Sequence, residues 1–401
     1  MLELALTVAG STAVLIWCYL LLGRGGFWRV RQLLSGTATI RPSGGDGGAT
    51  GNPRSAAGNL DRQLAVIIPA RNEAETVARS IESWLQPSGS HPIHIFLVDD
   101  GSSDGTANIA RAAATGLGMG DKLTVITGKP LPPGWLGKPW ALFQGVEQAR
   151  ELQPRFLLLT DADVAHAPED VARLLAIATA GGYDLASLMV RLHCRSLAER
   201  LLIPPFVFFF FMLYPPSWTA DAKRASAAAA GGCVLVRPEA LDRAGGLAAI
   251  RDQVIDDCSL AQAVKHSGGR IWLGLADRSA SLRPYHSFSE IERMIARTAF
   301  NQLRHSFWAL LLAVAAMALT YVLPIALLFL EHTVPLVLGL AGWGLMTIAY
   351  LPMVRYYKLQ PVWALSLPLA ALFYTGATVH SALKYCLGQG GEWKGRVQDP
   401  R

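Results

Sequence analysis

The feature that most limits the fold is a set of four long apolar segments, one at the start of the chain and three near its end. They comprise residues 4–23, 307–330, 334–354 and 361–383. None contains Asp, Glu, Lys or Arg, and His380 is the single ionisable histidine in the four segments. At 1.5 Å per residue, each can cross a hydrocarbon core of ~30 Å. We therefore expect an N-terminal transmembrane anchor over residues 1–23 and two or three further spans within residues 307–383.

The first segment could also be a cleaved signal peptide, but such peptides begin with basic residues. This one begins with Glu3 instead, so we interpret it as a retained anchor. Arg24, Arg29 and Arg31 follow it, and basic residues concentrate on the cytoplasmic side of a membrane. We expect the domain that follows to face the cytoplasm. If all three later segments span, the basic tail 384–401 lies on the side opposite the cytoplasm, against the usual distribution of basic residues. One of the three segments could therefore be re-entrant instead.

The composition agrees with a chain that is part membrane protein and part globular domain. Hydrophobic residues make up 51% and charged residues 16%, below the ~25% charged share of an average soluble domain. A disordered chain and a wholly soluble enzyme are excluded. The net charge of +6 comes without a long Lys/Arg run, so no nucleic-acid partner is expected. The five cysteines have no CxxC spacing, which argues against a zinc site or a disulfide framework.

Two segments around the globular part have a special composition. Residues 24–61 are rich in Gly and Ser and are predicted to form a juxtamembrane segment and a flexible linker. Residues 203–214 are apolar and aromatic but too few to span. With Arg200 before them and Lys223 after them, we favour a segment that lies in the headgroup layer, within residues 198–218. A core element of the globular domain is the alternative.

Between residues 62 and 286, short apolar runs alternate with segments of helical pattern. The runs are residues 65–68, 95–98, 123–126 and 156–159. Apolar strands separated by helices predict an α/β fold, in which a mostly parallel sheet carries helices on both faces. Ligands of such sheets bind beyond the carboxyl ends of the strands, and the polar motifs of this chain stand there.

Three polar motifs follow the first, second and fourth of these runs. They are PARNE at 69–73, DDGSSDGT at 99–106 and TDAD at 160–163. On extended backbone, Asp161 and Asp163 point to the same side. Two such carboxylates suit Mg²⁺ or Mn²⁺ that bridges to substrate phosphates. The first two motifs can also be ordinary turn and N-cap chemistry.

In this order, the three motifs resemble those of inverting family 2 glycosyltransferases of the GT-A fold, over about residues 64–280. Further stretches, among them LPPGWLGKPWAL at 131–142 and IDDCSLAQAVK at 255–265, are similar to the hopene-associated glycosyltransferases, a bacterial membrane group. The resemblance implies a nucleotide-sugar donor, a divalent metal ion, and a lipid or lipid-like hydroxyl acceptor with a hopanoid among the candidates. It also implies a multi-pass protein of the bacterial inner membrane.

The resemblance implies roles for individual residues. Those expected to hold the nucleotide sugar are Pro69, Ala70, Arg71, Glu73, Lys138 and Asp161, with one or both of Asp99 and Asp100. Asp161 and Asp163 match the metal-binding motif of the family. Gly232 and Cys233 resemble the loop beneath the acceptor, although they could equally be a turn before a strand.

The resemblance also assigns the general base to Asp257, the second acid of the Asp256–Asp257 pair that opens a helix. Inverting transfer needs a carboxylate to take the proton of the acceptor hydroxyl as that oxygen attacks the anomeric carbon. Repulsion by Asp256 would raise the pKa of Asp257 towards neutral pH. Acids that merely cap a helix are the alternative.

A basic amphipathic helix is expected over residues 287–306. At about 100° per residue, Arg293, Arg297 and Arg304 fall within a narrow arc of that helix. The arginines could clamp a diphosphate, meet anionic headgroups or face solvent. His305 stands where related membrane glycosyltransferases carry Trp, which disfavours a polymer synthase.

Two other functions stay open. A nucleotidyltransferase of related fold would use the metal site but need no base at Asp257, and it would release pyrophosphate. A non-catalytic scaffold or transporter would carry polar residues inside its spans, where this chain has only His380.

Overall fold

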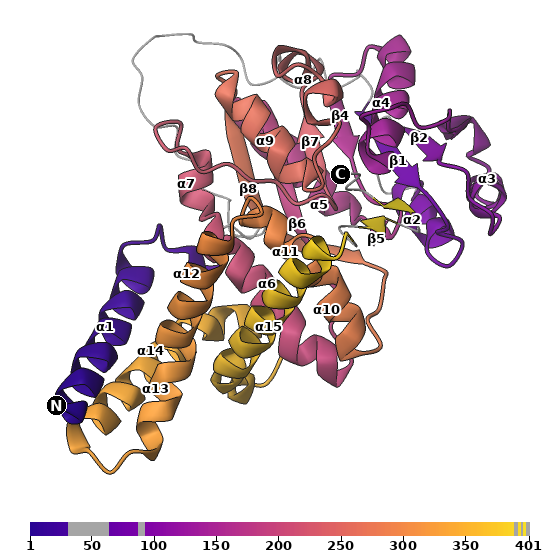
Figure 1. The fold of residues 1–401 in the computed structure, drawn as a ribbon. Helices are drawn as coiled ribbons and strands as arrows, with labels where there is room; N and C mark the ends of the chain where they lie inside the picture. Colours follow the sequence, from indigo (N-terminus) through magenta and orange to yellow (C-terminus); the bar gives the residue numbers. More distant parts are fainter. Residues whose placement is uncertain (31–63, 87–92, 389–391, 394–395, 398–401) are drawn as a thin grey trace, which may run out of the picture. The chain divides into compact units, whose positions relative to one another are not determined.

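The computed structural model describes residues 1–30, 64–86, 93–388, 392–393 and 396–397 (Figure 1). The chain forms two compact units. The sheet unit comprises Arg31–Leu192 and Thr219–Arg283, and the helical unit comprises Met1–Val30, His193–Trp218 and Pro284–Arg401. The expected linker lies mostly in residues 31–63, outside the described residues.

The sheet unit is built on one eight-stranded sheet with the strand order β3-β2-β1-β4-β7-β6-β8-β5. The strands are β1 Leu64–Ala70, β2 Ile93–Asp99, β3 Leu123–Thr127, β4 Phe156–Leu159, β5 Val164–Ala165, β6 Leu185–Arg191, β7 Val234–Val236 and β8 Ile271–Ser281. Strands β1 to β4 are parallel, β7 runs antiparallel between β4 and β6, and β6 is parallel to β8. The predicted mostly parallel sheet is therefore confirmed.

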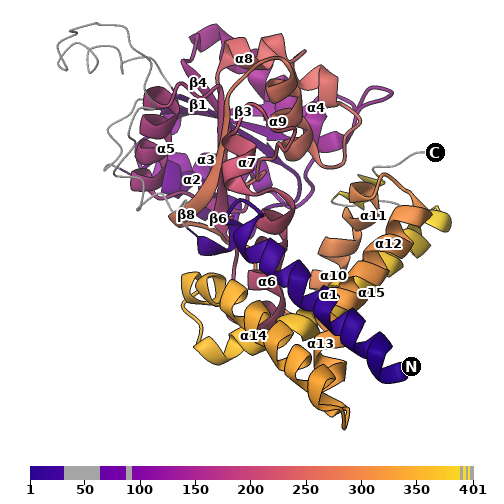
Figure 2. The ribbon, with the colours of Figure 1, turned by 90° about the vertical axis from the view of Figure 1, so that its left-hand side faces the viewer.

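Helices cover both faces of this sheet (Figure 2). One face carries α2 Val77–Trp84, α3 Thr106–Gly116 and α5 Pro168–Ala180, and the other carries α4 Gly137–Ala149, α8 Pro238–Arg243 and α9 Asp256–His266. Side chains of β1 alternate between the two layers: Val66 packs in the first and Ile67 in the second. Because both faces are covered, the strands read as unbroken apolar runs.

The helical unit contains α1 Leu2–Leu22, α6 Leu197–Leu213, α10 Phe288–Ala296, α11 Ala299–Gln302, α12 Phe307–Met317, α13 Leu323–Ala326, α14 Thr333–Tyr356 and α15 Leu367–Cys386. A short helix α7, Pro216–Ala220, follows α6 where the chain leaves this unit. In the described part of the chain, five stretches are long and apolar enough to cross a membrane: Leu2–Leu22, Leu197–Ala220, Phe307–Phe329, Thr333–Tyr356 and Pro361–Cys386.

The mid-chain segment differs from one of the alternatives predicted for it, a core element of the globular domain. It is longer than its apolar core, because Ser196 caps α6 and the helix begins at Leu197. It packs in the helical unit, with α14 and α15, and is therefore not a core element of the sheet unit. By length and composition it joins the candidate spans.

The expected basic helix over 287–306 is interrupted. Helix α10 ends at Ala296, where the Ser381 hydroxyl donates to the Ala296 carbonyl at 2.5 Å and accepts the Phe300 N–H at 3.1 Å. These two backbone groups would otherwise bond to each other, so the inserted side chain breaks the helical ladder. Arg304 then adopts a left-handed conformation, φ 52°, and does not continue the helical face of Arg293.

Buried polar side chains of the helical unit bond to helix carbonyl groups. The Trp17 indole N–H donates to the Thr320 carbonyl at 3.0 Å, inside a π-helical turn, Ala318–Val322. The Tyr374 hydroxyl donates to the Leu202 carbonyl at 2.9 Å, in a helix that contains prolines and so lacks some of its own donors. These bonds join helices that an apolar interior would otherwise pack without direction.

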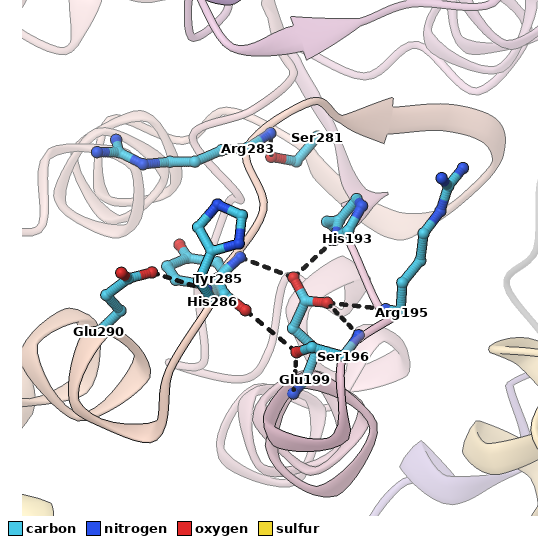
Figure 3. A network of polar contacts seen from close by, with 9 residues as sticks. All are labelled: His193, Arg195, Ser196, Glu199, Ser281, Arg283, Tyr285, His286 and Glu290. Atoms are coloured by element: carbon cyan, nitrogen blue, oxygen red, sulfur yellow. Dashed lines mark hydrogen bonds and ion pairs between the residues drawn. The ribbon is translucent and has the colours of Figure 1, made fainter.

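Glu199 fastens the two places where the chain enters the helical unit, at His193 and before Tyr285 (Figure 3). One of its oxygens accepts the Tyr285 N–H at 2.7 Å and His193 Nδ1 at 2.6 Å. The other accepts the N–H groups of Arg195 and Ser196, each at 2.8 Å. The carboxylate is buried, and four donors compensate its burial. In the sequence, the Ser196-x-x-Glu199 capping pattern was the feature that could have indicated this role of Glu199.

Replacing Glu199 with glutamine is expected to lower the thermal stability of the purified protein. An amide nitrogen cannot accept hydrogen bonds, so two of the four donors lose their partner, at about 1–3 kcal/mol each. The measurement is the unfolding midpoint in detergent. Glu290→Gln is the matched control, since the half-buried Glu290 lies in the first turn of α10 and its carboxylate accepts the His286 N–H. Equal midpoints in the two variants would contradict the role of Glu199.

Candidate active site

The loops after β1 and β2 interlock at the carboxyl edge of the sheet. The Asn72 N–H donates to Ser102 Oγ at 3.0 Å, and the Ser103 N–H donates to Asn72 Oδ1 at 2.9 Å. Glu73 donates its N–H to Thr106 Oγ1 at 2.8 Å. The first two polar motifs therefore form one surface, as expected for loops at the ends of neighbouring parallel strands.

Arg71 joins this surface to the buried Asp100. Its Nη1 donates to the Asp100 carbonyl and lies 3.8 Å from the Asp100 carboxylate. Asp99 accepts the Ser102 N–H at 3.1 Å. The structure thus brings these expected nucleotide residues together with Glu73. Pro69 and Ala70, which were also expected to hold the nucleotide, offer no exposed side chain there, because both are buried within β1.

A second cluster surrounds Lys138, the second residue of α4. Its ammonium lies 2.9 Å from Asp161 Oδ1 and 3.4 Å from Asp256 Oδ2. Burial alone would lower the pKa of Lys138, but the charges of Asp161, Asp256 and Asp257 outweigh burial and raise that pKa. The side chain therefore carries a fixed positive charge between acids from the end of β4 and the start of α9.

Asp257 lies at the base of this cluster. Its Oδ2 accepts the Gly231 N–H at 2.6 Å and its Oδ1 accepts the Cys258 N–H at 2.7 Å. Burial, and then repulsion by Asp256, raise the pKa of Asp257 to about 6, although Lys138 and both N–H groups act in the opposite direction. A carboxylate with that pKa is mostly ionised at neutral pH and can still take up a proton.

These groups line a pocket with a polar side and an apolar side. The polar side is formed by Lys138, Thr160, Gly231, Asp256 and Asp257. The apolar residues of the lining are Leu142, Leu159, Val234, Leu247, Ile250 and Leu260. A few convergent polar groups beside an apolar wall are typical of a small-molecule site.

The structure differs from the prediction for Gly232 and Cys233, which were expected near the acceptor. The Cys233 side chain is fully buried in a hydrophobic layer of the sheet, so it does not line the pocket. The neighbouring Gly231 does. A Cβ atom at Gly231 would lie 3.2 Å from both Asp257 Oδ2 and Lys138 Nζ. The glycine keeps open the space between the acid and the ammonium.

Gly231→Ala is expected to lower kcat by about tenfold to a hundredfold with little change in nucleotide binding. The added methyl occupies the space through which an acceptor oxygen would reach Asp257, and a misplacement of about 1 Å can cost that much. Steady-state kinetics test this. Gly116→Ala is the matched control, because a Cβ there meets no atom within 4 Å. Wild-type turnover in Gly231→Ala would remove the glycine from the acceptor path.

The two acids of the TDAD motif differ in exposure. The Asp161 side chain is 37% exposed, whereas that of Asp163 is 18% exposed, with Arg283 Nη1 at 4.0 Å. Within the described ranges, no group of three or more His, Cys, Asp or Glu side chains could hold a metal ion. Mg²⁺ in phosphate-binding sites takes only one or two carboxylates and completes its shell with water and substrate. The donor set fits that kind of site rather than a closed protein cage.

Arg304 is not among the residues that the sheet unit brings together, because it belongs to the helical unit. Sequence reasoning also missed two residues beneath the cluster, Thr160 and His166. Both are buried polar side chains on the segment that carries Asp161 and Asp163. Their only sequence signal was a polar residue at each end of an acidic motif, which is too common to single them out.

Comparisons with known proteins found a matching family model and several similar chains. The model of glycosyl transferase family 2 matches residues 65–244. Over 114 residues the chain is 33% identical to the 4,4'-diaponeurosporenoate glycosyltransferases of Staphylococcus aureus strains bovine RF122 / ET3-1 and USA300. Each alignment covers 28% of this chain, which thus spans about a quarter (27%) of these relatives.

Two solved structures are also similar to this chain. A mannosyltransferase from Pyrobaculum calidifontis, in complex with GDP-Man and Mn²⁺, aligns at 17% identity and a TM-score of 0.49, covering 92% of this chain and 97% of that one. Glucosyl-3-phosphoglycerate synthase from Mycobacterium tuberculosis, in complex with Mn²⁺, UDP-Glc and phosphoglyceric acid, aligns at 19% identity and a TM-score of 0.39, covering 62% and 82%.

Proposed function

We propose that this chain, whose residues 65–244 match the model of glycosyl transferase family 2, transfers a sugar from a nucleotide-sugar donor to the hydroxyl of a lipid or lipid-like acceptor, with inversion. The observation that carries the proposal is the half-buried carboxylate of Asp257 beside Lys138 and Asp256 in one pocket. This arrangement supplies a base and a fixed positive charge within reach of the same substrate.

In the proposed reaction, Asp257 acts as the general base. The acceptor oxygen approaches past Gly231 and gives its proton to Asp257 as it bonds to the anomeric carbon. The N–H groups of Gly231 and Cys258 hold the two carboxylate oxygens in place. Asp257 must be ionised to accept this proton. Because its pKa is raised to about 6, we expect turnover to rise with pH through this value.

The leaving diphosphate needs positive charge. Lys138 provides one such charge, and its position next to Asp161 places it at the edge of the proposed metal site. Asp161, with Asp163, would hold Mg²⁺ or Mn²⁺, and the ion would neutralise the diphosphate as it leaves. Arg71 and the interlocked loops after β1 and β2 would hold the nucleoside end, beyond the strand ends where such ligands bind.

A lipid acceptor is supported by the membrane character of the chain. Five described stretches could cross a membrane, and the basic residues after the first, Arg24 and Arg29, favour a cytoplasmic catalytic domain. The relatives named as 4,4'-diaponeurosporenoate glycosyltransferases are compatible with such an acceptor. We place the protein in the bacterial inner membrane and keep a hopanoid among the candidate acceptors. Arg304 remains a candidate for headgroup or diphosphate contact.

The test is an assay of membranes that contain the protein. They are incubated with a panel of UDP-, GDP- and dTDP-sugars, with and without EDTA, and the lipids are analysed by mass spectrometry. The proposal expects a new glycolipid and a nucleoside diphosphate, both absent with EDTA. Release of pyrophosphate instead would indicate a nucleotidyltransferase.

A further inference from the structure

A buried hydroxyl connects the metal-motif strand to the loop above it. Thr160, the residue after β4, donates its hydroxyl proton to the Gly232 carbonyl at 2.8 Å. The same oxygen lies 2.8 Å from His166 Nε2. Thr160 and His166 are 1% and 3% exposed, so solvent does not compete for these bonds.

The two bonds fix the state of the imidazole. Thr160 has one hydroxyl proton, and the Gly232 carbonyl can only accept it. The contact with His166 is therefore one in which Nε2 carries a proton and donates it to the hydroxyl oxygen. Burial lowers the pKa of His166 to about 3, which agrees with a neutral ring. The bonds thus run in one direction, from His166 through Thr160 to Gly232.

His166 is itself held from the opposite side. The backbone N–H of His166 donates to Ser83 Oγ at 3.0 Å, and the Ser83 hydroxyl donates to the Ser80 carbonyl at 2.7 Å. The ring packs against Trp84 with centroids 4.3 Å apart. Helix α2 therefore contacts His166 both at its backbone N–H and at its ring.

The loop above leads directly to the proposed base. The Gly232 carbonyl accepts the Thr160 proton, while the N–H of the preceding residue, Gly231, donates to Asp257 Oδ2. A Cβ atom at Gly232 would lie 2.9 Å from Val190 Cγ2, so the loop packs closely against β6. A change in the Gly232 carbonyl bond therefore reaches Asp257 through two residues, Gly231 and Gly232.

We propose that His166 and Thr160 are positioning residues that set the Gly231–Gly232 loop and thereby orient the carboxylate of Asp257. The inference rests on the proposed function, in which Asp257 is the base. Thr160 borders the pocket, but its hydroxyl is bonded to the Gly232 carbonyl and to His166, and neither side chain is given a contact with substrate in the proposed reaction. Packing alone does not require two polar groups here, because buried polar side chains are costly unless paired.

The test compares matched variants of the full-length protein in membranes, with the sugar donor that gives turnover in the panel. Thr160→Val removes the hydroxyl at nearly constant volume, and Thr160→Ser keeps it. His166→Leu removes the donor, and His166→Gln keeps an N–H that can reach Thr160. The readouts are kcat, the KM for the donor and the pH dependence of kcat/KM.

Thr160→Val and His166→Leu are expected to lower kcat by about tenfold to a hundredfold and leave the donor KM within about twofold of wild type. The acidic limb of the pH profile should move upward, because a weakened Gly231 bond no longer favours the ionised form of Asp257. Thr160→Ser and His166→Gln should recover most of kcat. The double variant Thr160→Val/His166→Leu should be no slower than either single variant, because both act through one chain.

Unchanged kcat and an unchanged pH profile in Thr160→Val would overturn the inference. So would a loss of kcat that Thr160→Ser does not recover, which also covers the case in which the valine variant fails to fold. The variant Asp257→Asn separates a failure of the proposed function from a failure of the positioning inference. If Asp257→Asn keeps turnover, the proposed base is wrong; if it is inactive while Thr160→Val equals wild type, only the positioning chain is wrong.

Discussion

Asp257→Asn is expected to lose sugar transfer by about 10²- to 10⁴-fold while it still binds the nucleotide. The amide cannot take up the acceptor proton, and general-base catalysis commonly contributes that much. The nucleotide contacts proposed for Arg71 and the loops after β1 and β2 do not involve Asp257. Transfer is measured as product formed per protein, and binding as the affinity for the nucleoside diphosphate in the presence of Mn²⁺.

The matched control is Asp252→Asn, a few residues earlier. Asp252 is exposed and its carboxylate accepts only from the Gln253 side chain among the bonds the structure describes. It should keep wild-type transfer. If Asp257→Asn also keeps it, Asp257 is not the base, and the nucleotidyltransferase alternative, which needs none there, gains support.

Lys138→Met is expected to have the second largest effect, a loss of about 10²- to 10³-fold in kcat. The variant removes the ammonium that lies between Asp161 and Asp256 and leaves their carboxylates, with that of Asp257, to repel one another. Because Lys138 lowers the pKa of Asp257, its removal should raise that pKa. The acidic limb of the pH profile, expected near pH 6 in the wild type, should move to higher pH.

The pH dependence of kcat/KM separates this effect from simple unfolding, which would lower turnover at every pH alike. Lys129→Met is the control, since Lys129 is an exposed lysine a short distance before α4. It should show the wild-type profile. A Lys138→Met variant with reduced kcat but an unmoved acidic limb would mean that the ammonium acts on the substrate alone and not on Asp257.

The motifs that follow strands were the part of the site best predicted from sequence. Parallel strands place their carboxyl ends at one edge, so PARNE, DDGSSDGT and TDAD could be expected at one edge of the sheet, where Arg71 contacts Asp100. The acceptor role expected of Cys233 came from the resemblance and not from this reasoning, and the structure buries its side chain in the core. One residue along a strand turns a side chain from the site to the core, and the loop-to-strand boundary there could not be placed to one residue.

Other features depend on contacts between distant segments, which no local pattern reports. Ser381 breaks the helix after Ala296 from 85 residues away, so the periodicity of residues 287–306 alone predicted a continuous helix. His166 is buried because α2 covers it, although a histidine after an acidic motif favours a surface position. Helix α6 exceeds its apolar run because a polar cap starts it.

One ammonium among three carboxylates leaves the pocket short of positive charge. A bare diphosphate would meet net repulsion on entry. In the proposed reaction, a divalent ion held by Asp161 and Asp163 would supply the missing positive charge and restore electrical balance in the cleft. The acids that surround Lys138 therefore make an accompanying cation a condition for diphosphate binding.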